Sequence, residues 1–266
     1  MASSVKSDGG IVETIKTVFW ALVIAIAFRS ILFQPFWIPT ESMKSSLLIG
    51  DFIFVNKMAY GYSRYSCEVP MTKISLCPIS GRVLATEPER GDVVVFRHPT
   101  AGSDYIKRLI GLPGDTIQMK DGLLYLNGEL APQVADGTFE EINEPQGPMR
   151  SRPRCETIVG EGAICSKSQA IETLPGGRTH KVLNVDVNGP GDNTDIFTVP
   201  PGHYFFMGDN RDNSLDSRFS VNTGGVGFVP AEYLIGRADR VIFSSAGRSM
   251  LFFWTWRSDR YFKAVE

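Results

Sequence analysis

The chain has 266 residues, of which 43% are hydrophobic and 21% charged, and its formal net charge is −2. This composition lies in the globular range and excludes a disordered or collagen-like chain. The charge is close to zero and no Lys/Arg block is longer than a pair, which argues against nucleic acid as a partner. The length allows one large domain, or one domain with an elaboration.

An apolar segment near the N-terminus is predicted to span a membrane. Every residue from Val18 to Phe28 is apolar, and after Arg29 the run resumes as far as Phe33. This is close to the roughly 20 residues that a spanning helix needs, and an arginine near one end can reach the headgroups. We therefore expect an anchor over residues 17–34. A cleaved secretion signal would end in small residues, and a buried core helix would more often carry a polar face.

Four cysteines occur as two local pairs, Cys67 with Cys77 and Cys155 with Cys165. Neither pair has the CxxC spacing that zinc or redox sites favour, whereas an even count in loop-like sequence favours disulfides. Three connectivities are possible, and four free buried thiols are the alternative. Disulfides would place the large C-terminal part outside the cytoplasm and residues 1–16 inside, as a cytoplasmic tail.

The rest of the chain is predicted to be predominantly β. Short β-branched or aromatic runs bounded by turn residues indicate strands at 51–56, 92–97, 104–110, 123–127 and 203–207. Asp121-Gly122 predicts a tight hairpin. No long amphipathic helix follows the anchor.

Two stretches interrupt this pattern, each containing one cysteine pair. Residues of about 60–88 predict a short insertion, and residues 129–196, rich in Gly, Pro, Asn and Glu, predict a looser inserted subdomain. A main β domain would then consist of residues 35–128 and 197–266.

The first candidates for chemistry are a serine and a lysine. Ser42 lies between the anchor and the first strand, and Thr40 offers a hydroxyl two residues earlier. Lys107 lies in the middle of an apolar strand, where it either points inward or blunts a sheet edge. Burial would lower its pKa from about 10.4 and make the neutral amine available as a base. A serine nucleophile needs such a base, and Ser–Lys is an established alternative to Ser–His–Asp.

The other polar features are a loop and three scattered histidines. The segment 207–218 concentrates acidic, amide and arginine side chains, and it could aim Ser214 at the base. His98, His180 and His203 are far apart in the sequence and belong to no metal-binding motif, so we expect neither a metal nor a cofactor. A histidine base from His98 or His203 is the alternative to Lys107.

Together these segments resemble the bacterial type I signal peptidases, or leader peptidases, a Ser/Lys-dyad serine protease family. The resemblance rests on S-M followed by L-L-I-G-D, then Y-I-K-R-L-I-G-L-P-G-D, then G-D-N-R-D-N-S-x-D-S-R. It covers the anchor and residues 35–57, 91–115 and 204–240, and leaves the insertions outside. It implies a predominantly β, signal-peptidase/LexA-like complex fold with one N-terminal transmembrane helix. It also implies removal of N-terminal signal peptides from exported preproteins after small residues of the A-x-A type.

The resemblance also implies residue roles. Ser42 would be the nucleophile and Lys107 the general base, with Ser214 orienting the lysine. The backbone N–H of Ser42 and the hydroxyl of Thr40 would form the oxyanion hole. Shallow apolar pockets for small substrate side chains would be lined by Phe36, Ile38, Pro39, Met43, Leu47, Tyr105 and Ile106. A structural loop would consist of Asp209, Asn210, Arg211, Asp216 and Arg218.

Two positions depart from the family pattern. Glu41 replaces a usually small residue beside the nucleophile, and Ser45-Ser46 replaces Pro-Thr. Neither change removes a catalytic atom. A related Ser/Lys protease with a dedicated client, of the conjugation or self-cleaving type, and an inactive tethered binding homologue are the alternatives.

The expected location is the bacterial inner membrane, with a single span and the catalytic domain on the periplasmic side. The expected partners are preproteins with signal peptides, and membrane lipid. The aromatic run 251–256 could dip into the interface, with core packing as the alternative.

Overall fold

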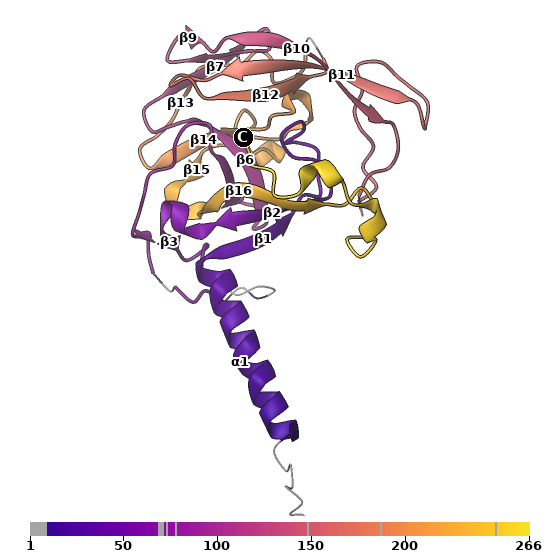
Figure 1. Cartoon of the computed structure of the whole chain (residues 1–266). Coiled ribbons are helices and arrows are strands. Elements are labelled where there is room, and N and C mark those ends of the chain that lie inside the picture. Colours follow the sequence, from indigo (N-terminus) through magenta and orange to yellow (C-terminus); the bar gives the residue numbers. More distant parts are fainter. Residues whose placement is uncertain are drawn as a thin grey trace, which may run out of the picture.

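The computed structural model describes residues 10–68, 72, 74–77, 79–147, 149–186, 188–247 and 249–266. The described residues contain one α-helix, α1 (Gly10–Ile31). This helix extends away from a β-rich body (Figure 1). Helix α1 has 22 residues, about 33 Å at 1.5 Å per residue, which suits a bilayer core of about 30 Å. Most of the predicted tail, residues 1–9, lies outside the described residues.

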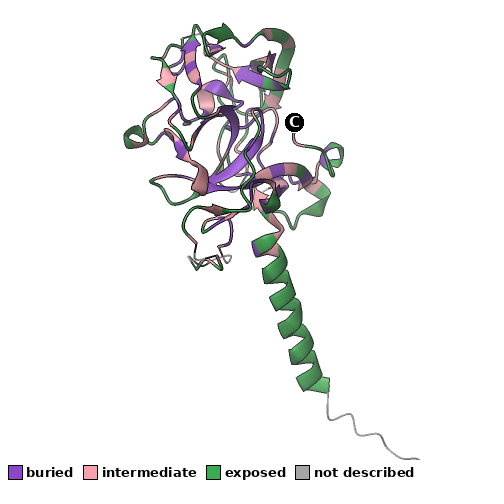
Figure 2. Ribbon diagram, turned by 90° about the vertical axis from the view of Figure 1, so that its left-hand side faces the viewer, coloured by how far each residue is buried: buried purple, intermediate pink, exposed green. Residues whose placement is uncertain are grey.

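The side chains of α1 are exposed almost throughout (Figure 2). The helix has a mean hydropathy of 2.0 over its most apolar window, and none of that window is buried in the body. A core helix is therefore excluded, and the chain carries one N-terminal helix suited to anchor it in a membrane.

The main sheet has seven strands in the order β1-β2-β16-β5-β6-β14-β15, with every neighbouring pair antiparallel. Its strands are β1 (Phe33–Trp37), β2 (Asp51–Asn56), β16 (Leu234–Ser244), β5 (Val93–Arg97), β6 (Asp104–Gly111), β14 (His203–Met207) and β15 (Val229–Pro230). Strand β1 follows α1 directly, so the anchor enters the body at one edge of this sheet.

Three smaller sheets complete the body. The four-stranded sheet contains β13 (Phe197–Thr198), β7 (Thr116–Lys120), β8 (Leu123–Leu126) and β9 (Glu129–Leu130). The three-stranded sheet contains β10 (Gln133–Ile142), β11 (Ile164–Thr173) and β12 (Thr179–Asn184), and the two-stranded one β3 (Tyr62–Ser63) and β4 (Arg82–Val83).

Short 3₁₀ turns lie between strands at η1 (Lys57–Tyr60), η2 (Arg211–Asn213), η3 (Val221–Thr223) and η4 (Ala231–Tyr233), and two more, η5 (Phe253–Thr255) and η6 (Ser258–Arg260), follow the last strand. The predicted strands and the predominantly β fold are confirmed. The hairpin between β7 and β8 is also confirmed, and Asp121 (φ 48°) and Gly122 (φ 75°) adopt the positive φ angles that its tight turn requires.

Both local cysteine pairs are disulfides, Cys67–Cys77 and Cys155–Cys165, and no cysteine is free. The second bond joins the start of β11 to the loop before it. Of the three connectivities that the sequence left open, the structure therefore has the local one.

Candidate active site

The segment that carries Ser42 is a series of turns between β1 and β2, residues 38–51, called here the Ser42 turn. Its two ends are joined by backbone hydrogen bonds between Ile38 and Asp51 and between Gly50 and Ile38, each 2.9 Å long. Gly50 has φ +91°, and a Cβ there would lie 1.9 Å from the carbonyl oxygen of Ser245. Only glycine fits this close approach of two backbones.

The Ser42 turn brings its serine to Lys107 of β6. Lys107 Nζ lies 2.6 Å from Ser42 Oγ and 3.1 Å from the carbonyl oxygen of Ile106. Lys107 is 4% exposed and Ser42 8%. Of the two predicted positions for Lys107, pointing inward or lying exposed on a sheet edge, the structure supports the inward one.

Burial changes the acid–base chemistry of Lys107. Loss of hydration lowers its pKa from the ordinary 10.5 to about 8, with the nearby Arg218 acting in the same direction and the carboxylates of Asp216 and Asp209 acting against it. At pH 7 about one lysine in ten is then neutral and can accept a proton, compared with about one in 3,000 at the ordinary pKa.

The loop after β14 lies beside this pair and is built on buried ion pairs. Both oxygens of Asp209 accept hydrogen bonds of 2.7 Å from Arg108, and both oxygens of Asp216 accept bonds of 2.9 Å from Arg218. Burial alone would raise the pKa of each carboxyl, but the arginines hold both pKa values below the usual range. Both carboxylates therefore stay ionised next to Lys107.

The same loop supports the Ser42 turn directly. Asn210 donates from its backbone N–H to the carbonyl oxygen of Ser42 and from its side chain to that of Glu41, each over 3.1 Å. Arg211, the next residue, forms an ion pair with Glu172 of β11. The structure thus brings the predicted loop residues together next to Ser42.

Gly208 and Ser214 lie where the loop touches the Ser42 turn. A Cβ on Gly208 would lie 2.3 Å from Ser214 Oγ and 2.6 Å from the carbonyl oxygen of Ser42. Ser214 is buried, but its Oγ has no hydrogen-bond partner among the described residues. The expected bond to Lys107 is not formed in this structure, in which Lys107 Nζ bonds to Ser42 and Ile106. The orienting role of Ser214 stays a prediction.

Known proteins are similar to this chain over most of its length. The family model for signal peptidase, peptidase S26, matches residues 11–243. The chain belongs to this family. It is 40% identical to signal peptidase I of Rickettsia typhi over 88% of this chain and 82% of that protein. Signal peptidase I of Rickettsia prowazekii is 41% identical with the same coverage. A solved signal peptidase I from Enterococcus faecalis aligns with 57% of this chain and 97% of its own, at 25% identity and a TM-score of 0.30.

Within this signal peptidase family member, the expected pocket residues divide between two core clusters. Ile38, Met43 and Leu47 are fully buried in one cluster, and Phe36 and Ile106 pack against its rim half-buried. Tyr105 packs against a different cluster, and Pro39 is half-buried. Phe36, Pro39, Tyr105 and Ile106 therefore keep surface that a substrate can reach.

The expected oxyanion groups are free to act. Thr40 is exposed two residues before Ser42. In the described part of the chain, no backbone hydrogen bond uses the N–H of Ser42. Both groups can therefore donate to a substrate oxygen, although their role stays a prediction.

None of the three histidines, all of which the structure describes, is hydrogen-bonded to Ser42. His98 Nε2 lies 3.1 Å from the carbonyl oxygen of Gly225, and its Nδ1 accepts from the backbone of Thr100 and Ala101. His180 lies 3.3 Å from Glu172, and His203 Nδ1 lies 3.0 Å from the carbonyl oxygen of Pro201. Ser42 has a lysine and not a histidine as its hydrogen-bond partner.

Sequence reasoning missed four charged residues around the site: the buried Arg108, Lys44 and Lys167, and the half-buried Glu141. Arg108 carried a signal, since an arginine in the middle of an apolar strand needs a carboxylate partner. Glu141 and Lys167 lie in the predicted insertion, and only the fold brings them to the Ser42 turn.

Proposed function

We propose that this chain is a membrane-anchored serine endopeptidase that removes N-terminal signal peptides from exported preproteins, cleaving after small residues. Ser42 is the nucleophile and Lys107 the general base. The observation that carries the proposal is the buried 2.6 Å contact between Ser42 Oγ and Lys107 Nζ in a chain of the signal peptidase family.

The geometry supports acyl transfer in two steps. Neutral Lys107 removes the proton of Ser42 as Oγ attacks the scissile carbonyl carbon, and the resulting ammonium then protonates the departing amine. In this proposal the N–H of Ser42 and the hydroxyl of Thr40 stabilise the oxyanion as hydrogen-bond donors. Water activated by the same lysine hydrolyses the acyl-enzyme and restores the free serine.

A free strand edge next to Lys107 supports binding of an extended substrate. Strand β5 pairs with β6 from Asp104 to Arg108, whereas β14 pairs with β6 only from Arg108 to Gly111. Of the described strands, β5 alone therefore pairs with Asp104–Ile106. An extended peptide can add to the other edge by main-chain hydrogen bonds, which would lead its scissile bond to Ser42.

Location follows from the anchor and the disulfides. We propose that α1 spans the bacterial inner membrane and that the body lies on the periplasmic side, where disulfides persist. Exposed apolar residues of the C-terminal run, Leu251, Phe253 and Trp254, lie near an apolar cavity of about 260 Å³ lined partly by Trp37 and Met250. These residues support contact with membrane lipid.

We propose that the body is divided into the main domain and the two insertions that the sequence predicts. Residues 35–128 and 197–266 carry the dyad, its ion pairs and the main sheet, with a short insertion at about 60–88. Residues 129–196 form an inserted subdomain built on β10, β11 and β12.

The test is cleavage of a preprotein by the full chain in detergent micelles. Ser42→Ala and Lys107→Met are both expected to lower kcat/KM by at least about 1,000-fold, as loss of one member of a catalytic pair does. Lys181→Met, an exposed lysine on β12, is the control and should cleave normally. Activity surviving in Lys107→Met would refute the dyad, and wild-type protein that cleaves nothing would favour an inactive binding homologue.

A second readout separates general from dedicated proteases. The proposal expects cleavage of several unrelated preproteins at the same type of site. Cleavage of a single client would identify the narrow Ser/Lys protease instead.

A further inference from the structure

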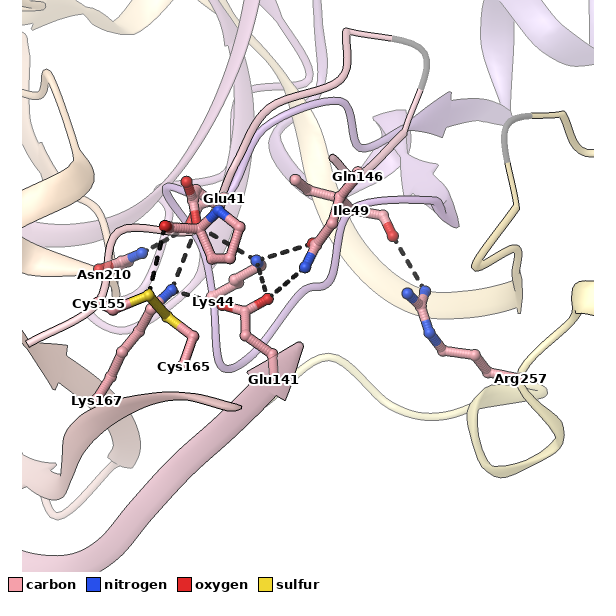
Figure 3. Close-up of polar contacts among 11 residues, drawn as sticks. Glu41, Lys44, Ile49, Glu141, Gln146, Cys155, Cys165, Lys167, Asn210 and Arg257 are labelled. Atoms are coloured by element: carbon pink, nitrogen blue, oxygen red, sulfur yellow. Dashed lines mark hydrogen bonds and ion pairs between the residues drawn. A yellow bond between two sulfur atoms is a disulfide. The ribbon is translucent and has the colours of Figure 1, made fainter. Parts of the chain in front are cut away.

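Glu41 directly precedes the nucleophile, yet its side chain is only 9% exposed. Its Oε2 lies 3.3 Å from Lys44 Nζ and 3.3 Å from Lys167 Nζ (Figure 3). A lone buried carboxylate here would be costly and would bias the charge of the dyad. The two lysines offset both effects.

A second carboxylate completes this cluster. Glu141 of β10 accepts 2.6 Å bonds from Lys44 through Oε2 and from Lys167 through Oε1. Gln146 joins it by accepting from Lys44 over 3.0 Å and donating to Glu141 over 2.6 Å. Burial would raise the pKa of Glu141, but the two ammonium groups hold it below its usual value.

Burial and register show that the cluster is built rather than accidental. The side chains of Lys44 and Lys167 are 1% and 0% exposed, and that of Glu141 is 11% exposed. In the β10–β11 ladder, Glu141 pairs with Cys165 and Phe139 with Lys167, so Glu141 and Lys167 project from the same face toward the Ser42 turn. The Cys155–Cys165 disulfide closes the loop beside them (Figure 3).

The cluster contains two carboxylates and two ammonium groups, each lysine touching both glutamates, so its net charge is zero. One pair comes from the Ser42 turn and the other from the three-stranded sheet. Such a cluster ties two elements in one geometry, because separating them would leave buried charges unpaired.

We propose that four residues form a charge-balanced clamp: Glu41, Lys44, Glu141 and Lys167. Through this clamp the three-stranded sheet positions the Ser42 turn. Because the clamp has no net charge, it does not shift the pKa of Lys107. These are positioning residues and do not touch the reacting atoms. The proposal rests on the proposed function, and it explains why a charge is tolerated beside the nucleophile.

The sign of each perturbation follows from the groups around Lys107. Asp216 and Asp209 raise its pKa and Arg218 lowers it, Tyr105 lies against it, and His98 is a neighbour of lowered pKa. Removing one clamp charge leaves these groups unchanged. It adds one uncompensated charge on the side of Ser42.

The experiment measures kcat/KM against pH for the full chain, with Glu41→Gln, Lys167→Met and the double variant. Glu41→Gln leaves excess positive charge and should move the acid limb of the profile down by about 0.5–1 pH unit. Lys167→Met leaves excess negative charge and should move it up by about as much. The double variant restores balance and should return the limb to the wild-type position. Both single variants should lower kcat by about 10- to 100-fold with little change in KM.

The outcomes decide the proposal separately from the function. The clamp proposal is wrong if the acid limb of the pH profile does not move, or if it moves in the same direction in both single variants. In either case wild-type cleavage of the preprotein would still support the proposed function. Lys181→Met, the same change on the neighbouring strand β12, should move nothing. If Glu41→Gln does not unfold cooperatively on heating, Glu141→Gln replaces it and must move the limb down. If Lys167→Met does not, Lys44→Met replaces it and must move the limb up.

Discussion

Replacing Lys107 by Met should stabilise the folded protein while destroying its activity. Because burial lowers the pKa of Lys107 from 10.5 to about 8, the folded state holds a charged ammonium at pH 7 at a cost of about 3 kcal/mol. Met fills a similar volume without this cost but loses the hydrogen bond to Ser42, which is worth about 1 kcal/mol. The free energy of unfolding should rise by about 2 kcal/mol, or about 4–8 °C in Tm.

The gain depends on pH with a definite sign. Below pH 8 both states of the wild type hold the proton, so the penalty is complete. Between pH 8 and 10.5 the folded state releases the proton while the unfolded state keeps it, and the wild type gains stability as pH rises. The advantage of Lys107→Met should therefore disappear by about pH 10.5. Thermal unfolding in detergent at pH 7 and pH 10.5, with Lys181→Met as the exposed control, measures it. A Tm that falls at pH 7 would refute the burial argument.

The same pKa predicts the kinetics of the wild type. The neutral fraction of Lys107 rises from about 9% at pH 7 to about 91% at pH 9, so kcat/KM should rise about tenfold and then level off. A rise that continues steeply beyond pH 9 would mean an ordinary lysine.

Three further changes test the surroundings of the dyad. Gly208→Ala should lower kcat/KM by about 100-fold, because its Cβ would lie 2.6 Å from the carbonyl oxygen of Ser42; a loss under threefold would contradict the close approach. Arg108→Met should lower the free energy of unfolding by about 3–5 kcal/mol by leaving buried Asp209 unpaired, and an unchanged denaturation midpoint would exclude this. Joint replacement of Cys155 and Cys165 by Ser should cost about 2–3 kcal/mol, as measured by Tm, and an equal Tm would show that the bond is dispensable.

Local sequence was enough to predict five strands and to propose Ser42 and Lys107 as a pair, but strand β16 and strands β10, β11 and β12 were not predicted. Strands β2, β6 and β14 are short apolar runs between turn residues, and period-two patterns of this kind identify strands without knowledge of the fold. Lys107 could be proposed as the general base because a lysine inside such a run is either an edge residue or a buried base. The motifs around Ser42 and at 207–218 favoured the base.

The supporting contacts could not be predicted, because their partners are far apart in the chain. Arg108 and Asp209 are separated by 101 residues, and Lys167 and Glu41 by 126. Glu41 has Lys44 three residues away in the sequence, whereas only the fold supplies its second lysine, Lys167. The bond of Ser46 Oγ to Asp209, at 2.5 Å, likewise shows that a serine at this departure from the family pattern ties the Ser42 turn to the loop.

The pKa of Lys107 reflects how its neighbours are paired. Asp216 and Asp209 favour the ammonium form of Lys107, but Arg218, which is bonded to Asp216, opposes that effect. The Asp216–Arg218 ion pair therefore acts on the lysine more as a dipole than as a full charge, and burial is the largest influence on its pKa. It follows that Asp216→Asn alone should lower the pKa of Lys107 further than removing Asp216 and Arg218 together. Comparing the acid limbs of the single and double variants would measure the difference, and equal limbs would mean that the arginine does not screen its partner.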